Sequence, residues 1–251
     1  MMKINLSIIL FIFCLANVST GKEEQAVPSA SKDKFIGVFV SLADNKNQGI
    51  VPVPEAIGNG DDPEKNLYWG TADGLKGFFD KSKRWKLLEK QEVAKGDVLR
   101  TRTYRLENSN VVLFAQAYRG TAIRKCIQDF ELAVQSGTYD LVVYIGHNGL
   151  MDFNLPLPEK SGRQAKIPDC IVLCCKSEAY FKTRLEKLGG HPLLMTTQFM
   201  YPGSFIVDAI VENWINGDNP GKIRESAGVA YSKNQKISAK SAVGVFSEIK
   251  E

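Results

Sequence analysis

The sequence predicts an α/β protein, a three-layer sandwich with a mostly parallel central sheet. Two observations support this prediction. Short apolar runs rich in β-branched residues recur along the chain, and helix-compatible stretches lie between the later runs. Buried strands that alternate with helices form parallel sheets with right-handed crossovers. We therefore expect residues 35–251 to fold as a single domain, a length that supports one hydrophobic core.

The first residues have the layout of a secretory signal peptide. Lys3 precedes the apolar stretch Ile4–Ala16, and residues 17–21 are small and polar. The apolar stretch is shorter than the roughly 20 residues that span a bilayer. We expect residues 1–21 to be removed on export, to the periplasm or the outside, and no stable membrane span to remain. Cys14 suggests lipid attachment as an alternative, which the bulky Phe13 before it disfavours.

The amino-terminal half of the mature chain contains strands and two helices. Residues 22–34 are polar and charged, and we expect a flexible leader there. Residues 43–60 are rich in Gly, Pro and Asn, which indicates a long connection. Asp61, Pro63 and Glu64 are typical of a helix start, and this helix is expected to run to about Lys81. The expected strands are Phe35–Leu42, Trp85–Glu92, Val98–Leu106 and Val111–Tyr118, and the second helix runs from a Thr121 cap to Gln135.

Three compact apolar runs in the second half predict the rest of the parallel sheet. They are Leu141–Ile145, Ile171–Cys174 and Leu193–Thr196. In Val98–Leu106, Thr101, Thr103 and Arg105 alternate with Arg102 and Tyr104, so the hairpin that this run forms with the next strand lacks one strongly apolar face and is expected at a sheet edge. Helices are expected over 177–188, 202–215 and 221–231.

Composition argues against several functions. The net charge of +4 is spread over many Lys and Glu residues, unlike the clustered charge of a nucleic-acid binder. Two histidines and no CxxC pair give little support to zinc, and we expect neither metal nor cofactor. Four cysteines remain after export. They leave several disulfide pairings open, of which Cys126–Cys170 is one.

Two reactive side chains follow neighbouring predicted strands. His147 comes after the run that ends at Ile145, and Cys175 comes after the run that ends at Cys174. Ligands of open parallel sheets bind outside the carboxyl ends of the strands, and a histidine can activate a thiol there. Successive strand residues point to opposite faces, so Cys174 and Cys175 differ in environment. Cys174 fits a core thiol, and Cys175 fits the nucleophile of a cysteine hydrolase.

Other residues near these strand ends are weaker candidates. Backbone amides around Gly146, Asn148 and Gly149, helped by that of Cys175, are candidates to bind an oxyanion. Asp152 is a candidate to orient the imidazole, although an Asp in a loop is more often a turn residue. His191 precedes a strand and is expected on the opposite side of the sheet. Residues that we consider for substrate contact are Tyr68, Trp69, Thr196, Thr197 and Gln198.

The two strand ends resemble a known family. An apolar strand ending in His with a close Gly, then an apolar strand ending in a small residue and Cys, is the pattern of the caspase, gingipain, legumain and separase group, clan CD. The matching segments are Val142–Gly149 and Ile171–Lys176. This resemblance implies a caspase-like fold, an acid/base role for His147 and a nucleophile role for Cys175. The segment 146–152 (GHNGLMD) is also similar to a group of bacterial exported proteins, which implies no substrate.

Two functions remain open from the sequence. The first is an exported peptidase or amidase with a peptide or amide substrate. The second is a non-catalytic exported protein that keeps the fold and binds a ligand or protein in the same crevice. The peptidase family usually has Gly directly after His, whereas Asn148 intervenes here. This departure favours the second function, while the two strand-end positions of His147 and Cys175 favour the first.

Overall fold

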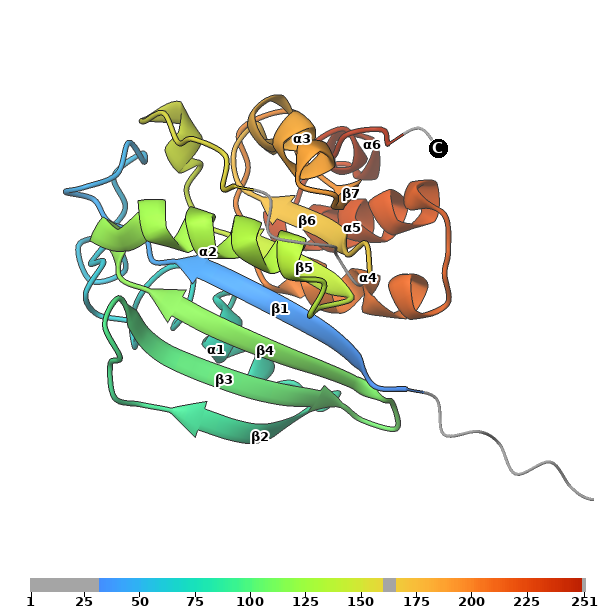
Figure 1. Ribbon diagram of the computed structural model, residues 1–251, viewed down its shortest axis with the longest axis horizontal. Helices are drawn as coiled ribbons and strands as arrows, with labels where there is room; N and C mark the ends of the chain where they lie inside the picture. The colour runs from blue at the N-terminus through green and yellow to red at the C-terminus, as the bar shows by residue number, and fades with distance from the viewer. Residues whose placement is uncertain (1–31, 160–165, 250–251) are drawn as a thin grey trace, which may run out of the picture. The chain divides into compact units, whose positions relative to one another are not determined.

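The computed structural model describes residues 32–159 and 166–249. A seven-stranded sheet runs through this part in the order β2-β3-β4-β1-β5-β6-β7 (Figure 1). The strands are β1 (Lys34–Ser41), β2 (Trp85–Gln91), β3 (Val98–Leu106), β4 (Val111–Tyr118), β5 (Leu141–Ile145), β6 (Asp169–Leu173) and β7 (His191–Leu194). The α helices are α1 (Leu75–Phe79), α2 (Ile123–Ser136), α3 (Ser177–Lys187), α4 (Phe205–Ile215), α5 (Pro220–Gln235) and α6 (Ala239–Val243).

The sheet is mostly parallel. β1 pairs in parallel with β4 on one side and with β5 on the other, and β6 and β7 continue the parallel part. β3 is antiparallel to both of its neighbours, β2 and β4, and β2 forms the edge. The predicted α/β class with a mostly parallel sheet is confirmed. The β3–β4 hairpin, however, lies one strand in from the edge, because β2 pairs with β3.

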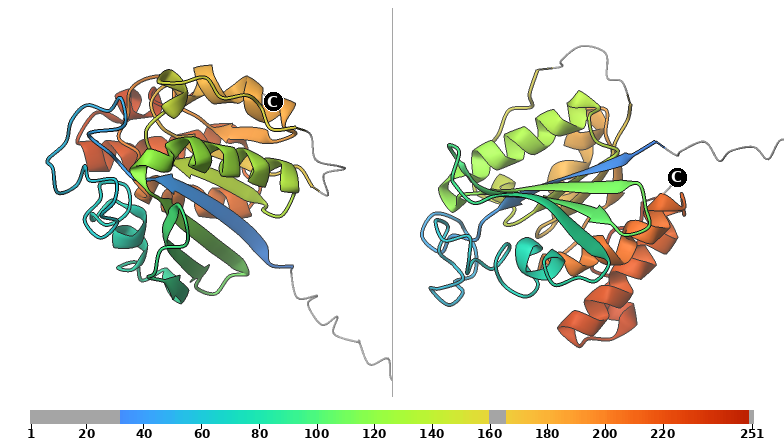
Figure 2. Two further views of the ribbon diagram at one scale, coloured as in Figure 1. Left: turned by 60° about the vertical axis from the view of Figure 1, so that its left-hand side comes forward. Right: turned by 90° about the horizontal axis from the view of Figure 1, so that it is seen from below.

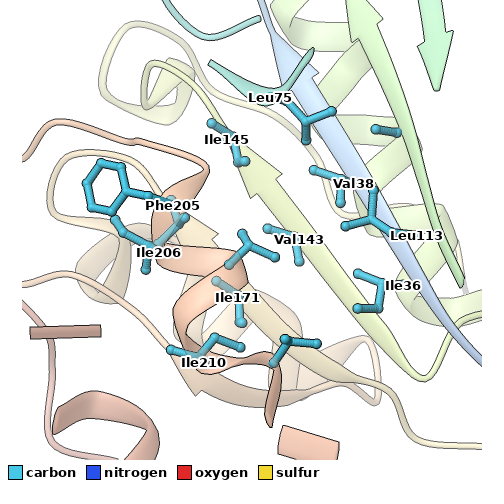
Figure 3. Packing of buried hydrophobic residues seen from close by; sticks show 14 of the residues in the cluster. Ile36, Val38, Leu75, Leu113, Val143, Ile145, Ile171, Phe205, Ile206 and Ile210 are labelled. Carbon is cyan, nitrogen blue, oxygen red and sulfur yellow. The ribbon is translucent and has the colours of Figure 1, made fainter. Parts of the chain in front are cut away.

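Alternate residues of the central strands pack into two separate cores. Val143 of β5 faces one core with α1, α4 and α5, whereas Tyr144 faces the other with α2 and α3. Figure 2 shows α2 on one side of the sheet and α4 and α5 on the other. Figure 3 shows strand residues such as Ile171 against Ile206 and Ile210 of α4. Helices on both faces explain why these strands are almost wholly apolar in sequence.

The prediction of a helix over residues 61–81 is wrong for most of its length. Residues 61–74 form successive turns, and only Leu75–Phe79 is α-helical. Asn66 provides the reason, since its buried side chain bonds to the distant backbone of Ala43 and to the carbonyl of Asn59. The same side chain accepts from the Tyr68 amide, a partner that a helix would otherwise supply from its backbone. Local capping signals at Asp61 therefore did not decide its structure.

Smaller differences concern element ends. Thr121 lies in a short 3₁₀ turn, Gly120–Ala122, and Ala122 precedes α2 without a side-chain cap bond. β7 begins at His191 and ends at Leu194, before the predicted Leu193–Thr196 run is complete. Helix α6 was not predicted. The signal peptide expected at 1–21 and most of the 22–34 leader lie outside the described residues, and β1 begins at Lys34.

From Lys32 onward the chain forms one compact unit. Within its described residues, each helix is too short or too polar to cross a membrane. Cys126, Cys170, Cys174 and Cys175 are all free, so the disulfide considered between the first two is absent. Burial raises the pKa of the Cys126 and Cys170 thiols, which keeps both protonated and unreactive at neutral pH.

Candidate active site

His147 follows β5 in a turn that requires glycine before it. Gly146 adopts φ +153°, a conformation that residues with side chains rarely adopt. A Cβ atom at Gly146 would also lie 2.9 Å from the backbone oxygen of Ser41 in β1. The Gly146 amide donates to Leu173 at the end of β6, at 3.2 Å. This turn therefore brings the loop after β5 against the ends of both neighbouring strands.

The imidazole of His147 is oriented by a carboxylate. Its Nε2 atom lies 2.7 Å from Oδ2 of Asp152, and only 7 % of the His147 side chain is exposed. The same Asp152 oxygen accepts a hydrogen bond from the backbone N–H of Gly49, at 3.0 Å. Asp152 thus receives hydrogen bonds from two loops. The sequence favours an ordinary turn role for this residue, whereas the structure places it in direct contact with the histidine.

The two adjacent cysteines occupy different environments, as strand alternation predicts. Cys174 is fully buried in the core that contains α2 and α3, and burial raises the pKa of its thiol well above the usual range. Cys175 is partly exposed. Lys176 then adopts the left-handed conformation (φ 51°, ψ 37°), and α3 begins at Ser177. This sharp turn separates the Cys175 side chain from the core and places it at a strand–helix junction.

Asn148 joins the histidine loop to the cysteine loop. Its fully buried side chain donates through Nδ2 to the backbone oxygen of Cys175, at 2.7 Å, and accepts through Oδ1 from the amide of Leu150, at 3.2 Å. A glycine at this position would make neither bond. Asn148, which stands where the peptidases named above usually have Gly, therefore has a structural role in positioning Cys175.

His147 and Cys175 line one cavity of about 460 Å³ at the carboxyl ends of the parallel strands. This volume falls within the range of about 300–1,000 Å³ that is usual for small-molecule sites. Loops after β1, β5, β6 and β7 all contribute to its wall. Besides His147 and Cys175, the wall consists of Gly49, Ile50, Val51, Val53, Leu67, Tyr68, Gly146, Met151, Phe199, Met200, Tyr201, Pro202 and Tyr231.

In the part of the chain that the structure describes, no direct hydrogen bond joins the Cys175 thiol to the His147 imidazole. The Cys175 Sγ atom instead contacts the backbone oxygen of Met200, at 3.7 Å. Such a long contact to sulfur is weak. The sequence predicted a direct or water-bridged contact, and the direct form is not seen in this conformation.

Backbone amides near the histidine are already partly used. The Gly146 amide donates to Leu173, and the Gly149 amide donates to the carbonyl of His147, at 3.1 Å. Neither is available to an oxyanion without rearrangement. The Cys175 amide differs, because it has no acceptor in the described part of the chain. The Asn148 amide, the third amide predicted near the histidine, likewise has no acceptor there, so Cys175 and Asn148 differ in this respect from the two glycines.

The residues considered for substrate contact separate into two groups. Tyr68 lines the cavity, and Asn66 positions it by accepting a hydrogen bond from the Tyr68 amide at 3.1 Å. Trp69 is fully buried in the core and does not reach the cavity. Thr196, Thr197 and Gln198 also lie outside the cavity wall.

These last three residues have structural partners. Buried Thr196 accepts from the Ser177 amide at the start of α3, at 3.0 Å, and donates to the backbone oxygen of Cys174. The side chains of Thr197 and Gln198 both donate to the backbone oxygen of Gly244 near the carboxyl end. Their position after a strand was predicted correctly, but their side chains bond to other parts of the protein and none of the three lines the cavity.

The sequence reading missed the loops that complete the cavity. Ile50 and Val51 come from the connection after β1, and Phe199 and Met200 come from the segment after β7. Both segments place apolar residues in loops at carboxyl strand ends, which is the signal that could have identified them. Tyr231 lies far away in sequence, on α5, and its hydroxyl accepts from the Tyr201 amide at 2.9 Å.

The remaining predicted residues agree with their expected positions. His191 lies at the amino end of β7, on the side opposite the cavity, and contacts Asp169.

The described residues contain no group of three or more His, Cys, Asp or Glu side chains that would hold a metal ion. In comparisons with family models, with curated proteins and with solved structures, the chain finds no match.

Proposed function

We propose that the protein is an exported cysteine-dependent hydrolase, a peptidase or amidase, with a caspase-like three-layer fold. One observation carries the proposal: a carboxylate-bound histidine and a partly exposed cysteine line the same cavity, at the ends of adjacent parallel strands. Cysteine hydrolases need these groups within reach of one substrate carbonyl. The signal-peptide pattern of residues 1–21 supports export.

The Asp152 contact assigns the imidazole nitrogens. An ionised carboxylate only accepts hydrogen bonds, so Nε2 of His147 carries the proton that faces Asp152. Nδ1 is then the unprotonated nitrogen of neutral His147, and it is the atom that accepts the Cys175 proton. Asp152 also stabilises the imidazolium that results.

The reaction proceeds in two halves. The Cys175 sulfur adds to the substrate carbonyl carbon, and its proton passes to His147. As the tetrahedral intermediate collapses, the C–N bond breaks and His147 returns the proton to the leaving amine. Water then adds to the thioester and transfers a proton to His147, and the C–S bond breaks. A carboxylic acid leaves, and Cys175 recovers its proton from His147.

The turn around Cys175 supports the stabilisation of the intermediate. Cys175 lies two residues before the start of α3, where the helix dipole favours negative charge. The Lys176, Ser177 and Glu178 amides already donate to the segment after β7, which leaves the Cys175 amide as the donor at this end of the helix. Asn148 holds the carbonyl side of the same residue. We propose that the Cys175 amide donates to the oxyanion, with Asn148 restraining the peptide units around it.

Selective thiol labelling combined with hydrolysis tests the proposal. Iodoacetamide at pH 7 is expected to alkylate Cys175 before the three buried thiols, as peptide mapping by mass spectrometry would show. Release of a fluorescent amine from a mixed peptide–amide library is expected to stop in Cys175→Ser. Cys174→Ala is the matched control, because it changes the neighbouring thiol and should keep both labelling and hydrolysis.

Two results would contradict this assignment. Faster alkylation of Cys174 or Cys126 in the folded protein would exclude Cys175 as the nucleophile. Amine release that persists in Cys175→Ser would assign the activity elsewhere. If the library is not cleaved at all while a ligand protects Cys175 from alkylation, the binding-protein function replaces the hydrolase.

A further inference from the structure

We infer that the cavity beside Cys175 accepts an uncharged, apolar side chain of the substrate, on the residue whose carbonyl Cys175 attacks. This inference rests on the proposed hydrolase function and names its substrate class. Charged side chains of either sign are excluded, and linear aliphatic or aromatic ones are accepted.

The chemistry of the wall supports this choice. In the described part of the chain, the side chains of the wall include no Asp, Glu, Lys or Arg. Ile50, Leu67 and Met200 supply aliphatic surface. A buried ion without a partner loses its hydration and gains nothing in return, whereas an apolar side chain gains from leaving water.

The tyrosines of the wall do not alter this balance. Burial raises the pKa of Tyr68 far above its usual range and that of Tyr201 to about 12, so both stay neutral. Burial also raises the pKa of Tyr231, whose hydroxyl is already engaged by the Tyr201 amide. These rings therefore present apolar faces and neutral hydroxyls to an occupant.

Charged residues near the cavity are turned to other partners. Asp152 bonds to His147 and to Gly49 and is not a wall residue. The ammonium of Lys176 lies 4.7 Å from the centre of the Phe199 ring, and Phe199 belongs to the wall whereas Lys176 does not. Neither charge is a wall residue available to pair with a substrate ion.

A second, larger cavity shows that the chain does not lack charged grooves. This groove of about 910 Å³ lies between α4 and α5 and is lined in part by Asp208, Asp218, Lys222, Glu225 and Lys233. Neither His147 nor Cys175 reaches it. The apolar wall is thus specific to the cavity that holds the candidate dyad.

Two chloromethyl ketones that differ in one charge test the inference. N-acetyl-norleucyl and N-acetyl-lysyl chloromethyl ketone share an alkyl side chain, which in lysine ends in an ammonium group. Each forms a thioether with Cys175, as the sulfur displaces chloride and the thiol proton passes to His147. The norleucyl probe is expected to label Cys175 at least about tenfold faster than the lysyl probe. One methylene in an apolar pocket contributes at least about tenfold, and an ammonium group without a partner should cost no less. Iodoacetamide carries no amino-acid side chain, so its rate measures the reactivity of the Cys175 thiol alone.

Charged substitutions in the wall provide the second arm. Val51→Asp adds a carboxylate to a wall residue that is 85 % exposed, so it should not disturb folding. Val93→Asp is the matched control, because Val93 is 77 % exposed and lies outside the cavity. The norleucyl-to-lysyl rate ratio should fall several-fold in Val51→Asp and in Phe199→Asp, and remain unchanged in Val93→Asp.

A ratio below tenfold in the unmodified protein overturns the inference, and so does a ratio that neither wall variant lowers. Failure of the proposed function has a different signature. In that case, His147→Ala leaves the iodoacetamide rate at Cys175 unchanged. The probe ratio is still measurable then, and it reports the side-chain preference of the cavity independently of catalysis.

Discussion

The protein contains two His–Asp pairs with the same separation and different surroundings. His147 Nε2 lies 2.7 Å from Asp152, and His191 Nδ1 lies 2.7 Å from Asp169. The first imidazole is 7 % exposed at the carboxyl ends of the strands, and the second is 51 % exposed at their amino ends. His147 shares a cavity with Cys175, whereas His191 does not line it.

This comparison shows that the same short His–Asp contact occurs in two different surroundings in one protein. At an exposed surface, such a contact contributes about 0–1 kcal/mol even between two full charges, and it is then screened by salt. At the carboxyl ends of parallel strands, loops converge and exclude water, which strengthens the same contact. The position of the pair in the sheet, and the thiol beside it, distinguish the two histidines.

The largest difference in hydrolysis rate between the two pairs is expected when each histidine is replaced in turn. His147→Ala is expected to reduce amide hydrolysis by a factor of about 10²–10⁴, because it removes the group that transfers the proton. His191→Ala should leave hydrolysis and Cys175 alkylation unchanged. Steady-state rates for both variants, with circular dichroism to verify folding, measure this difference. Equal losses in the two variants would refute the assignment of His147.

Replacement of the two aspartates should also affect the rate of hydrolysis in only one of the pairs, with a smaller loss than replacement of His147. Asp152→Asn keeps the shape but removes the charge that stabilises the imidazolium. Hydrogen bonds to charged groups contribute about 1.5–3 kcal/mol, which corresponds to a rate loss of about ten- to hundredfold. Asp169→Asn should leave the rate unchanged.

The Asp169 variant should instead lower stability. Asp169 also accepts a hydrogen bond from Nε1 of Trp214, at 2.8 Å, which the amide retains only in one orientation. A decrease of up to about 1 kcal/mol in the free energy of unfolding is expected from urea denaturation. A rate loss in Asp169→Asn without such a decrease would mean that the amino end of the sheet influences the cavity.

The smallest effect is expected from the loop that supports Asp152. A Cβ atom at Gly49 would lie 2.5 Å from Oδ1 of Asp152, so Gly49→Ala should displace the carboxylate and tilt the imidazole. Because the carboxylate can yield, the loss of rate should stay below about tenfold. Gly244→Ala, where the nearest contact is 3.4 Å, is the control in the same assay. A loss in Asp152→Asn with none in Gly49→Ala would show that the charge matters more than the position.

Apolar periodicity located most strands from the sequence. The predicted bounds of β3, β4 and β5 agree with the structure, because unbroken or alternating apolar runs bounded by turn residues are local signals. Helices α3, α4 and α5 were located within a few residues. The segment 61–74 was not, because the contacts of Asn66 with Ala43 are not visible in local sequence.

The sequence by itself determined that His147 and Cys175 follow adjacent parallel strands and that Cys174 and Cys175 differ. Strand order and side-chain alternation are enough for both conclusions. Only the tertiary structure decided that Asp152 holds the imidazole, that Asn148 connects to Cys175, and that an apolar cavity surrounds the thiol. These features depend on loops after four strands and on Tyr231 of α5. Their residues are distant in sequence and meet only when the sheet is complete.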